Sequence, residues 1–211
     1  GERTTTRVVT PDAAEPDVPE TQLARGGWEL TAERVETVFQ LSSATVVGAT
    51  SVYDDVRTRE AARSAAGIDH QWRFFFATAL TFRPPLAPGI GPMMILPTVR
   101  SEAQSAFASE LRERGFEDVS RGRTERVRTD GGDKLHLRSY AAELPLPSVG
   151  TTLSVTGWVG VWHADGFRIA AGAYPDRPVG EVLEFDDPEE PLDRSPAAYR
   201  DELLALIRAV E

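Results

Sequence analysis

Cysteine is absent from this chain of 211 residues, which excludes a disulfide framework, a thiolate metal site and a cysteine nucleophile. Lysine is almost absent as well, because Lys134 is the single lysine among 23 basic residues. No apolar run approaches the ~18 residues that a membrane-spanning helix requires. Acidic residues outnumber basic ones by 33 to 23, which gives a net charge of −10. This balance is unfavourable for general binding to nucleic acid, so we expect no nucleic-acid partner.

Sequence signatures of common enzymes are missing too. No serine stands in G-x-S-x-G, and neither G-x-G-x-x-G nor the phosphate-binding G-x-x-x-x-G-K-[ST] occurs. The three histidines, His70, His136 and His163, do not have the spacing of paired metal ligands. The sequence therefore predicts no catalytic residue, no metal site and no cofactor.

The acid-rich, lysine-poor composition resembles that of haloarchaeal proteins, whose acidic surfaces hold water in concentrated salt. A GC-rich bacterium, in which arginine replaces lysine, is the alternative source. Three adjacent acidic pairs lack the spacing of a calcium-binding loop, and in such a chain we interpret them as solvated surface. They are Asp54-Asp55, Asp186-Asp187 and Glu189-Glu190.

Residues 1–26 are rich in Thr, Pro, Asp and Glu and have few large apolar side chains. A segment of this composition cannot bury enough surface to offset the entropy lost on ordering. We predict a disordered polar tether here and a single folded domain over residues 27–211. The tether is either a ragged terminus or a spacer between a lipid-anchored N-terminus, lost with a removed upstream segment, and a domain outside the membrane.

Residues 153–174 predict the β-hairpin around which the sheet is built. Asp165-Gly166 is a strong signal for a two-residue turn, and with that turn Trp162 faces Ile169 across the strands. Side chains alternate along a strand, so Trp158 and Trp162 share one face. Both faces of the hairpin are largely apolar. We therefore expect a sheet covered on both sides, with both indole rings buried beneath a helix.

The rest of the chain predicts further strands and three helices. In the first strand the apolar alternation changes phase, which indicates a bulge near Glu33-Arg34, with a short helix as the alternative. Adjacent strands joined by hairpins indicate an α+β fold with a mostly antiparallel sheet flanked by helices. The strands are expected over 28–41, 45–53, 71–82, 116–128 and 134–144, and the helices over 58–66, 97–114 and 196–210.

Residues 84–97 contain five prolines, which exclude a strand in a sheet interior. We predict a loop folded over one end of the sheet. Its consecutive apolar residues suit an adaptable surface, so contact with a protein partner or with lipid is the functional alternative. These candidate contact residues are Met93, Met94, Ile95 and Leu96.

Residues 112–138 are basic within an acidic chain, with eight basic and six acidic side chains. Alternation predicts that Arg121 and Arg123 share one strand face and that Arg126 and Arg128 share the other. Guanidinium groups bind carboxylate and phosphate through paired hydrogen bonds, so the functional hypothesis is an anionic ligand or an acidic partner. Surface ion pairing is the alternative. The candidate ligand-binding residues are Arg121, Arg123, Arg126, His136, Arg138 and His163.

Short motifs near the N-terminus, W-x-L at 28–30, F-x-L at 39–41 and VYDD at 52–55, resemble an uncharacterised family of haloarchaeal exported, lipoprotein-like proteins. That family implies no known activity. The order of elements over residues 28–210, with GFRIAAGAYP leading to AAYRDELLALIRAV, resembles the PsbP-like α/β/α sandwich. This resemblance implies an antiparallel sheet between helices and an extrinsic, partner-binding module rather than an enzyme.

We therefore expect a non-enzymatic, extracytoplasmic domain of a halophilic archaeon that binds an unidentified protein partner or a small anionic ligand. A cytoplasmic location is the alternative. Two other functions stay open: a hydrolase that uses His136 or His163 with a nearby carboxylate, and a structural subunit that docks through residues 84–97. The hydrolase hypothesis requires one of these histidines within hydrogen-bond reach of a carboxylate in a pocket.

Overall fold

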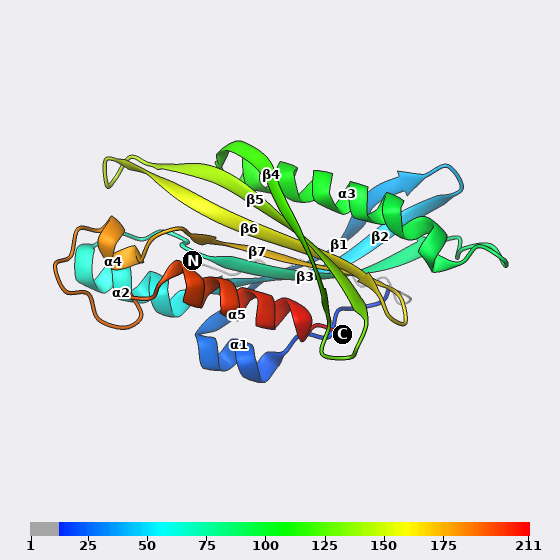
Figure 1. Ribbon diagram of the computed structural model, residues 1–211, viewed down its shortest axis with the longest axis horizontal. Helices are drawn as coiled ribbons and strands as arrows, with labels where there is room; N and C mark the ends of the chain where they lie inside the picture. Colours follow the sequence, from blue (N-terminus) through cyan, green and yellow to red (C-terminus); the bar gives the residue numbers. More distant parts are fainter. Residues whose placement is uncertain (1–12) are drawn as a thin grey trace.

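Seven β-strands pair into one antiparallel sheet in the order β1-β2-β3-β7-β6-β5-β4 (Figure 1). The computed structural model describes residues 13–211. The strands are β1 (Trp28–Leu41), β2 (Ala44–Asp55), β3 (Phe74–Arg83), β4 (Glu117–Arg128), β5 (Lys134–Leu146), β6 (Thr151–His163) and β7 (Phe167–Pro175). The helices of the described residues are α1 (Glu20–Gly26), α2 (Val56–Ala66), α3 (Pro92–Glu113), α4 (Val179–Val182) and α5 (Pro196–Arg208). The predicted α+β class with an antiparallel sheet is confirmed.

Helices cover both faces of the sheet, and each face has its own hydrophobic core. Figure 1 shows α3 above the sheet and α5 with α1 below it. Phe107 and Leu111 of α3 belong to one core cluster, whose side of the sheet we call the α3 face. Leu203 of α5 belongs to the other cluster, on the α5 face. Trp158 and Trp162 lie in this second cluster and are each 1% exposed, as the sequence predicted.

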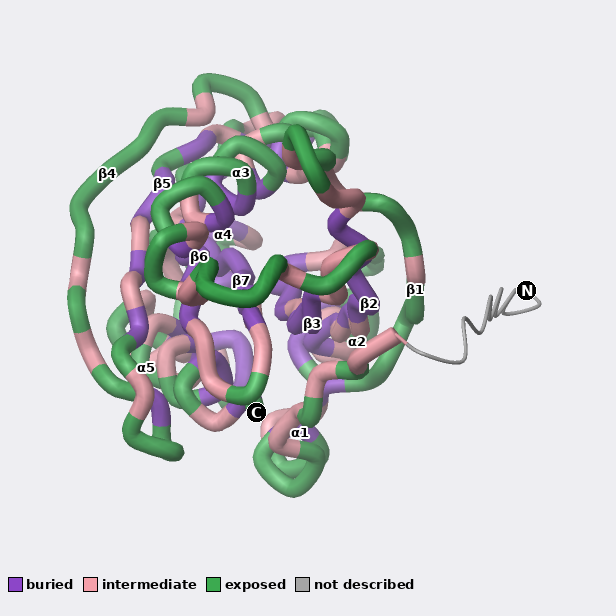
Figure 2. The backbone as a smooth tube through the Cα atoms, turned by 90° about the vertical axis from the view of Figure 1, so that its right-hand side faces the viewer, coloured by how far each residue is buried: buried purple, intermediate pink, exposed green. Residues whose placement is uncertain are grey.

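Helix α3 places β4 at one edge of the sheet. It carries the chain from β3, near the centre, to β4 at one edge. Three successive antiparallel connections then bring the chain back until β7 pairs with β3. The edge strands β1 and β4 are largely exposed (Figure 2). Register shifts interrupt the pairing of both edge strands, and such irregularities protect an edge from pairing with another chain.

The β6–β7 hairpin differs by one residue from its prediction. His163 pairs with Phe167, so residues 164–166 form a three-residue connection. A two-residue type I′ turn needs positive φ at both central positions, and within residues 13–211 the positive φ angles lie elsewhere. A one-residue shift moves every side chain of a strand to the other face. Ile169 therefore lies on the α3 face, and Tyr174 joins the tryptophans.

Strand β1 forms as predicted and the alternative helix does not, but its irregularities lie at other positions. The bulge expected near Glu33-Arg34 is replaced by register shifts between Leu30 and Ala32 and between Thr37 and Phe39. The second shift lies at Val38, whose Cγ1 would be 2.8 Å from a Cβ on Gly48 of β2. The glycine thus leaves space for this side chain across the strands.

Helix α3 starts inside the segment predicted to be a loop. Its first residue is Pro92, so residues 93–96 form its first turns. Proline is tolerated there because the first N–H groups of a helix have no intrahelical acceptor. Pro92 therefore marks the start of a helix. The prediction of a loop for residues 93–96 is wrong.

Part of the predicted tether is folded. Residues of α1 pack on the domain, with Leu23 at 2% exposure in the α5-face cluster. The backbone N–H and C=O of Asp17 pair with those of Glu211, each at 2.8 Å. One buried leucine and contacts with the chain's far end thus order a segment that is polar overall. The remaining part of the predicted tether, residues 1–12, lies outside the described residues.

Candidate anion-binding site

Strand β5 supplies the first part of a basic row on the α3 face. Leu135 and Leu137 are buried in the cluster of the α5 face. Because strand side chains alternate, His136, Arg138 and Tyr140 are directed to the α3 face. Tyr140 belongs to the α3-face cluster, and its hydroxyl donates a hydrogen bond to a backbone oxygen of α3 at 3.2 Å.

Strand β4 and helix α3 complete the row. Arg126 pairs with His136 and Arg121 with Tyr140 across the antiparallel ladder, so each pair shares a face. Arg112 of α3 lines the same groove as Arg121. Arg100, two turns from the start of α3, lies close enough to His136 to act on its charge. We call this set the arginine row: Arg100, Arg112, Arg121, Arg126 and Arg138.

A bulge in β4 places Arg121 on the same face as Arg126. The register shifts by one residue just after Arg121, so side chains that strict alternation separates come to share a face. Gly122 occupies the bulge, where a Cβ would clash with the hydroxyl of Ser139. That hydroxyl accepts a hydrogen bond from the backbone N–H of Arg123 at 2.8 Å. The predicted placement of Arg121 with Arg123 is therefore wrong.

A groove of about 400 Å³ lies between α3 and these strands. Three serines of α3 recur every four residues and so form one stripe along the helix. Their side chains are short and leave the space between helix and strands open. The groove is lined by Ser101, Gln104, Ser105, Ala108, Ser109, Arg112, Val119, Arg121 and Tyr140.

The arginine row is not paired with carboxylates in the part of the chain that the structure describes. Within residues 13–211 no member of the row forms an ion pair with a carboxylate, although nine other arginines do. The buried Nε atoms of Arg100 and Arg138 have no hydrogen-bond partner in this part of the chain. Burial lowers the pKa of Arg100, and the charge of Arg126 lowers it further. The row is thus a concentration of uncompensated positive charge.

His136 lies within this positive field. Burial lowers its pKa, and the charges of Arg100, Arg126 and Arg138 lower it further. A neutral imidazole has one donor and one acceptor nitrogen, and each guanidinium has five donors. Together with the serine hydroxyls, this set of donors suits a carboxylate, phosphate or sulfate group.

Arg123 and His163, two of the candidate ligand-binding residues, lie outside the row. Arg123 is on the α5 face, where its guanidinium lies 5.5 Å from the ring centre of Trp158 and pairs with Glu125 at 3.0 Å. His163 ends β6, and its ring packs edge-on against Phe167 with 4.8 Å between centroids. Of the six candidate ligand-binding residues, only Arg121 lines the groove.

The candidate contact residues at the start of α3 separate into two groups. Met93 and Met94 are 65% and 72% exposed. Leu96 is 8% exposed and belongs to the core, and Ile95 packs partly against it. A contact surface at this point can therefore include the two methionines but not Leu96.

The acidic pair Asp54-Asp55 is buried, so its prediction as solvated surface is wrong. The pairs at 186–187 and 189–190 are exposed.

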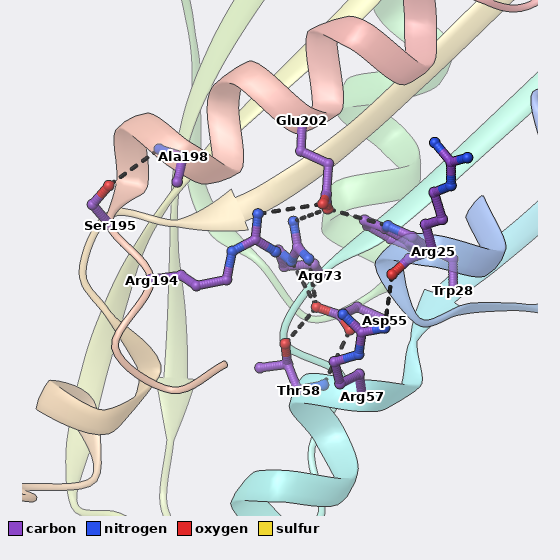
Figure 3. A network of polar contacts seen from close by, with 10 residues as sticks. All are labelled: Arg25, Trp28, Asp55, Arg57, Thr58, Arg73, Arg194, Ser195, Ala198 and Glu202. Carbon is purple, nitrogen blue, oxygen red and sulfur yellow. Dashed lines mark hydrogen bonds and ion pairs between the residues drawn. The ribbon is translucent and has the colours of Figure 1, made fainter. Parts of the chain in front are cut away.

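Asp55 pairs with the buried Arg73 at 2.6 Å, and Arg73 also pairs with Glu202 of α5 at 2.8 Å (Figure 3). The Arg73 guanidinium lies between the rings of Trp28 and Tyr199, 4.7 and 4.5 Å from their centres. The carboxylates of Asp55 and Glu202 compensate the charge of Arg73, so we assign this Arg73 network to the fold. The one sequence signal for it was a lone arginine within the aromatic run Q-W-R-F-F-F.

Two further findings concern membranes and metals. Among residues 13–211, no helix combines the length and the apolar character needed to cross a membrane. In the same residues, no three or more His, Asp or Glu side chains gather in a way that could hold a metal ion.

Comparison with known proteins identifies one family. The sequence model of a family described as "Domain of unknown function (DUF6517)" matches residues 15–211. The match thus includes α1, the whole sheet and α5. No curated protein matches the chain.

Proposed function

Since the chain belongs to the family described as Domain of unknown function (DUF6517), we propose its function from the site alone: it is a non-enzymatic domain that binds an anionic group. The ligand carries a carboxylate, phosphate or sulfate and binds between α3 and strands β4 and β5. It is either a small molecule or an acidic segment of a partner protein, because the groove is open to both.

The observation that carries this proposal is the unpaired arginine row in an acidic protein. The chain has 33 acidic and 23 basic side chains, so carboxylates for pairing are plentiful. Arg100 and Arg138 are partly buried, whereas Arg112, Arg121 and Arg126 are exposed. Like charges that lie close together repel one another, and an opposite charge nearby lowers that cost. An anion in the groove provides that charge next to Arg112 and Arg121, the two members of the row that line it.

The dimensions and lining of the groove agree with a small polar ligand. Its volume of about 400 Å³ falls within the range of about 300–1,000 Å³ that is usual for ligand sites. Arg112 and Arg121 approach it from opposite walls, one from α3 and one from β4. Two guanidinium groups from different elements can hold one anion between them, with serine hydroxyls as additional donors.

The hydrolase alternative has less support. Within residues 13–211, neither His136 nor His163 forms an ion pair or hydrogen bond with a carboxylate. The nearest charges to His136 are guanidinium groups, which disfavour the imidazolium that a general base forms during catalysis. A binding role needs neither a carboxylate partner nor a proton transfer.

We also propose that the domain works outside the cytoplasm of a halophilic archaeon, attached to the membrane on its N-terminal side. The acid-rich, lysine-poor composition and the resemblance to haloarchaeal exported, lipoprotein-like proteins support this setting. A sheet between helices on both faces supports the likeness to PsbP-like domains, which mostly act as partner-binding modules. Protease added to intact cells should degrade the protein; full protection would place it in the cytoplasm.

Calorimetric titration with phosphate, citrate and poly-glutamate tests the anion site. We expect the wild-type protein to bind at least one of these anions. The double variant Arg112→Gln/Arg121→Gln should bind it at least about tenfold more weakly, because each charge-assisted hydrogen bond contributes about 1.5–3 kcal/mol. Raising the salt concentration should weaken binding through screening.

The matched control is Arg123→Gln/Arg177→Gln, which changes the net charge equally. Arg123 lies on the opposite face of β4, and Arg177 pairs with Glu181 at the surface. This variant should bind like the wild type. An equal loss of anion affinity in both double variants would show that the effect comes from net charge alone, which would contradict the proposed site. An absence of anion binding by the wild type would contradict it as well.

A further inference from the structure

The connection from β3 to α3 ends in an apolar tip, which we define as residues 84–94. Large hydrophobic side chains with high exposure in residues 13–211 are Leu30, Ile90, Met93 and Met94, and three of these four lie in the tip. Their exposed fractions are 40% for Ile90, 65% for Met93 and 72% for Met94. In Figure 1 this connection projects at the right-hand end of the molecule.

The tip is uncharged in a chain of which 27% is charged. Residues 84–99 contain no Asp, Glu, Lys or Arg, and residues 70–101 contain no Asp or Glu. The net charge of −10 therefore resides elsewhere in the chain. This end of the molecule can approach a negatively charged surface without a carboxylate of its own in the way.

The backbone of the tip also has few N–H groups that would lose a hydrogen bond on transfer from water to an apolar medium. Four of its residues are prolines, which have no N–H to desolvate. The N–H of Ile90 donates to the carbonyl of Ala87 at 3.1 Å, and that of Met94 donates to the carbonyl of Gly91 at 3.0 Å. Unsatisfied backbone donors are the main cost of placing a loop in an apolar medium, and here several are absent or paired.

Two arginines flank the tip along the chain, Arg83 directly before it and Arg100 six residues after Met94. Neither of them forms an ion pair within residues 13–211. One buried nitrogen of each, Nη2 of Arg83 and Nε of Arg100, has no hydrogen-bond partner there. Along the chain, the apolar tip thus lies between two arginines of intermediate exposure that have no carboxylate partner within residues 13–211.

We propose that the apolar tip docks the domain onto an anionic lipid surface, with Ile90, Met93 and Met94 entering the interface and Arg83 and Arg100 contacting lipid phosphates. A bilayer interface offers an apolar layer directly beneath a layer of negative charge, which matches both parts of this surface. A symmetric contact with a second copy would bring the same arginines against each other, which disfavours that occupant. The proposal does not rest on the anion-binding groove, and its test keeps Arg100 unchanged because Arg100 also belongs to the arginine row.

Co-sedimentation with vesicles tests the docking surface. Vesicles are made of phosphatidylcholine alone or mixed with phosphatidylglycerol, and we expect binding mainly to the anionic mixture. Met93→Ser/Met94→Ser should lower the partition coefficient at least about tenfold, because two exposed apolar side chains no longer enter the interface. Leu30→Ser is the control, because Leu30 is the exposed hydrophobic side chain that lies on β1 and outside the tip. This variant should change the partition coefficient by less than about twofold. Circular dichroism confirms that both variants are folded.

A fluorescent reporter distinguishes insertion from surface adsorption. The four native tryptophans are at most 5% exposed, so Ile90→Trp introduces an exposed indole. Its emission should shift to the blue and its quenching by acrylamide should fall when anionic vesicles are added. No shift in a protein that co-sediments would contradict insertion of the tip.

Other outcomes would also overturn the proposal. Failure of the wild type to bind anionic vesicles would do so, as would unchanged binding by the methionine variant. Loss of vesicle binding in Arg112→Gln/Arg121→Gln, with the methionine variant unaffected, would assign the lipid phosphate to the groove. Concentration-dependent dimers in light scattering that Met93→Ser/Met94→Ser abolishes would assign the tip to a second copy. The proposal itself expects Arg112→Gln/Arg121→Gln to bind vesicles like the wild type, so a negative result for the groove would leave the test of the tip unaffected.

Discussion

Single side chains of this protein carry positive charge in two contrasting environments. Arg73 is buried between two aromatic rings and is paired with carboxylates of Asp55 and Glu202, so the fold itself compensates its charge. The arginine row has no such partners among residues 13–211, and a histidine with a lowered pKa lies within it. The first environment stabilises the native state, whereas the second leaves guanidinium donors available to an external anion.

The pKa of His136 should report on that anion. It is lowered in the free protein by burial and by three nearby arginines. The stability that depends on neutral His136 is therefore present above its unfolded-state pKa and is lost as the pH falls through its folded-state pKa. A bound anion offsets the guanidinium charges, so phosphate should raise the pKa of His136 in an NMR titration, with His136→Gln assigning the signal.

His70 is the internal control for this titration. Burial is the main cause of its lowered pKa, and the charge of Arg59 rather than of the arginine row contributes. Its pKa should not respond to phosphate. Equal shifts of both histidines, or a His136 pKa at or above the ordinary value in the free protein, would contradict the electrostatic account of the site.

At the scale of elements, small residues determine how closely α5 approaches the sheet. Gly172 of β7 lies under Leu203 of α5, and a Cβ on this glycine would be 2.6 Å from Leu203 Cδ1. The same Cβ would clash with the backbone carbonyl of Phe74 on β3. Gly160 of β6 lies similarly near Ile207. These glycines let the helix rest on β6 and β7 while large rings fill the space beside them.

Gly172→Ala should therefore lower the free energy of unfolding by about 1–3 kcal/mol, because the added methyl group overpacks the interface between α5 and the sheet. Urea denaturation measures the change. Gly131→Ala serves as the control, since a Cβ there meets only ordinary contacts at 3.7 and 3.8 Å. If both variants unfold at the same urea concentration, close packing at Gly172 does not contribute to stability.

At the scale of the whole molecule, the Arg73 network joins segments that are far apart in the sequence. Arg73 and Glu202 are separated by 129 positions, yet their side chains are 2.8 Å apart. Trp28 extends the network to β1, and Asp55 connects it to the start of α2 by accepting from the N–H of Thr58 at 3.1 Å. One guanidinium group thus connects α5 with the start of α2, and Trp28 of β1 joins them through Glu202.

Arg73→Met should destabilise the protein by about 3–5 kcal/mol, because it leaves the carboxylate of Asp55 buried without its partner. The double variant Arg73→Met/Asp55→Asn should recover part of this loss, since asparagine still caps α2 and adds no charge. Thermal and urea unfolding of both variants measure the difference. A double variant no more stable than Arg73→Met would show that packing against Trp28 and Tyr199, rather than charge, is what the arginine contributes.

The site was partly visible in the sequence. Arg121, Arg126, His136 and Arg138 lie together because strands β4 and β5 pair. The sequence predicted these two strands over residues 116–128 and 134–144, joined as a hairpin. Arg100 was missed as a site residue because it belongs to a helix whose position over these strands has no local signal. Arg123 was included because strict alternation cannot anticipate the bulge at Gly122.

The sequence by itself determined the elements that short-range signals specify. The spacing of apolar residues along a helix or strand is such a signal, because it depends on only a few neighbouring residues. Two helix-end signals are equally local, and the structure has both: Ser195 caps the start of α5, and Gly67 follows α2 with a left-handed backbone. The antiparallel α+β class follows from the order of these elements.

Only the tertiary structure decided the order of strands, the register of β6–β7, the burial of Asp54-Asp55 and the face of Arg121. Each of these depends on partners distant in the chain or on φ angles at a turn, and a change of one residue in register reverses every side chain of a strand. Charge pairing between remote segments likewise exists only after folding has brought them together.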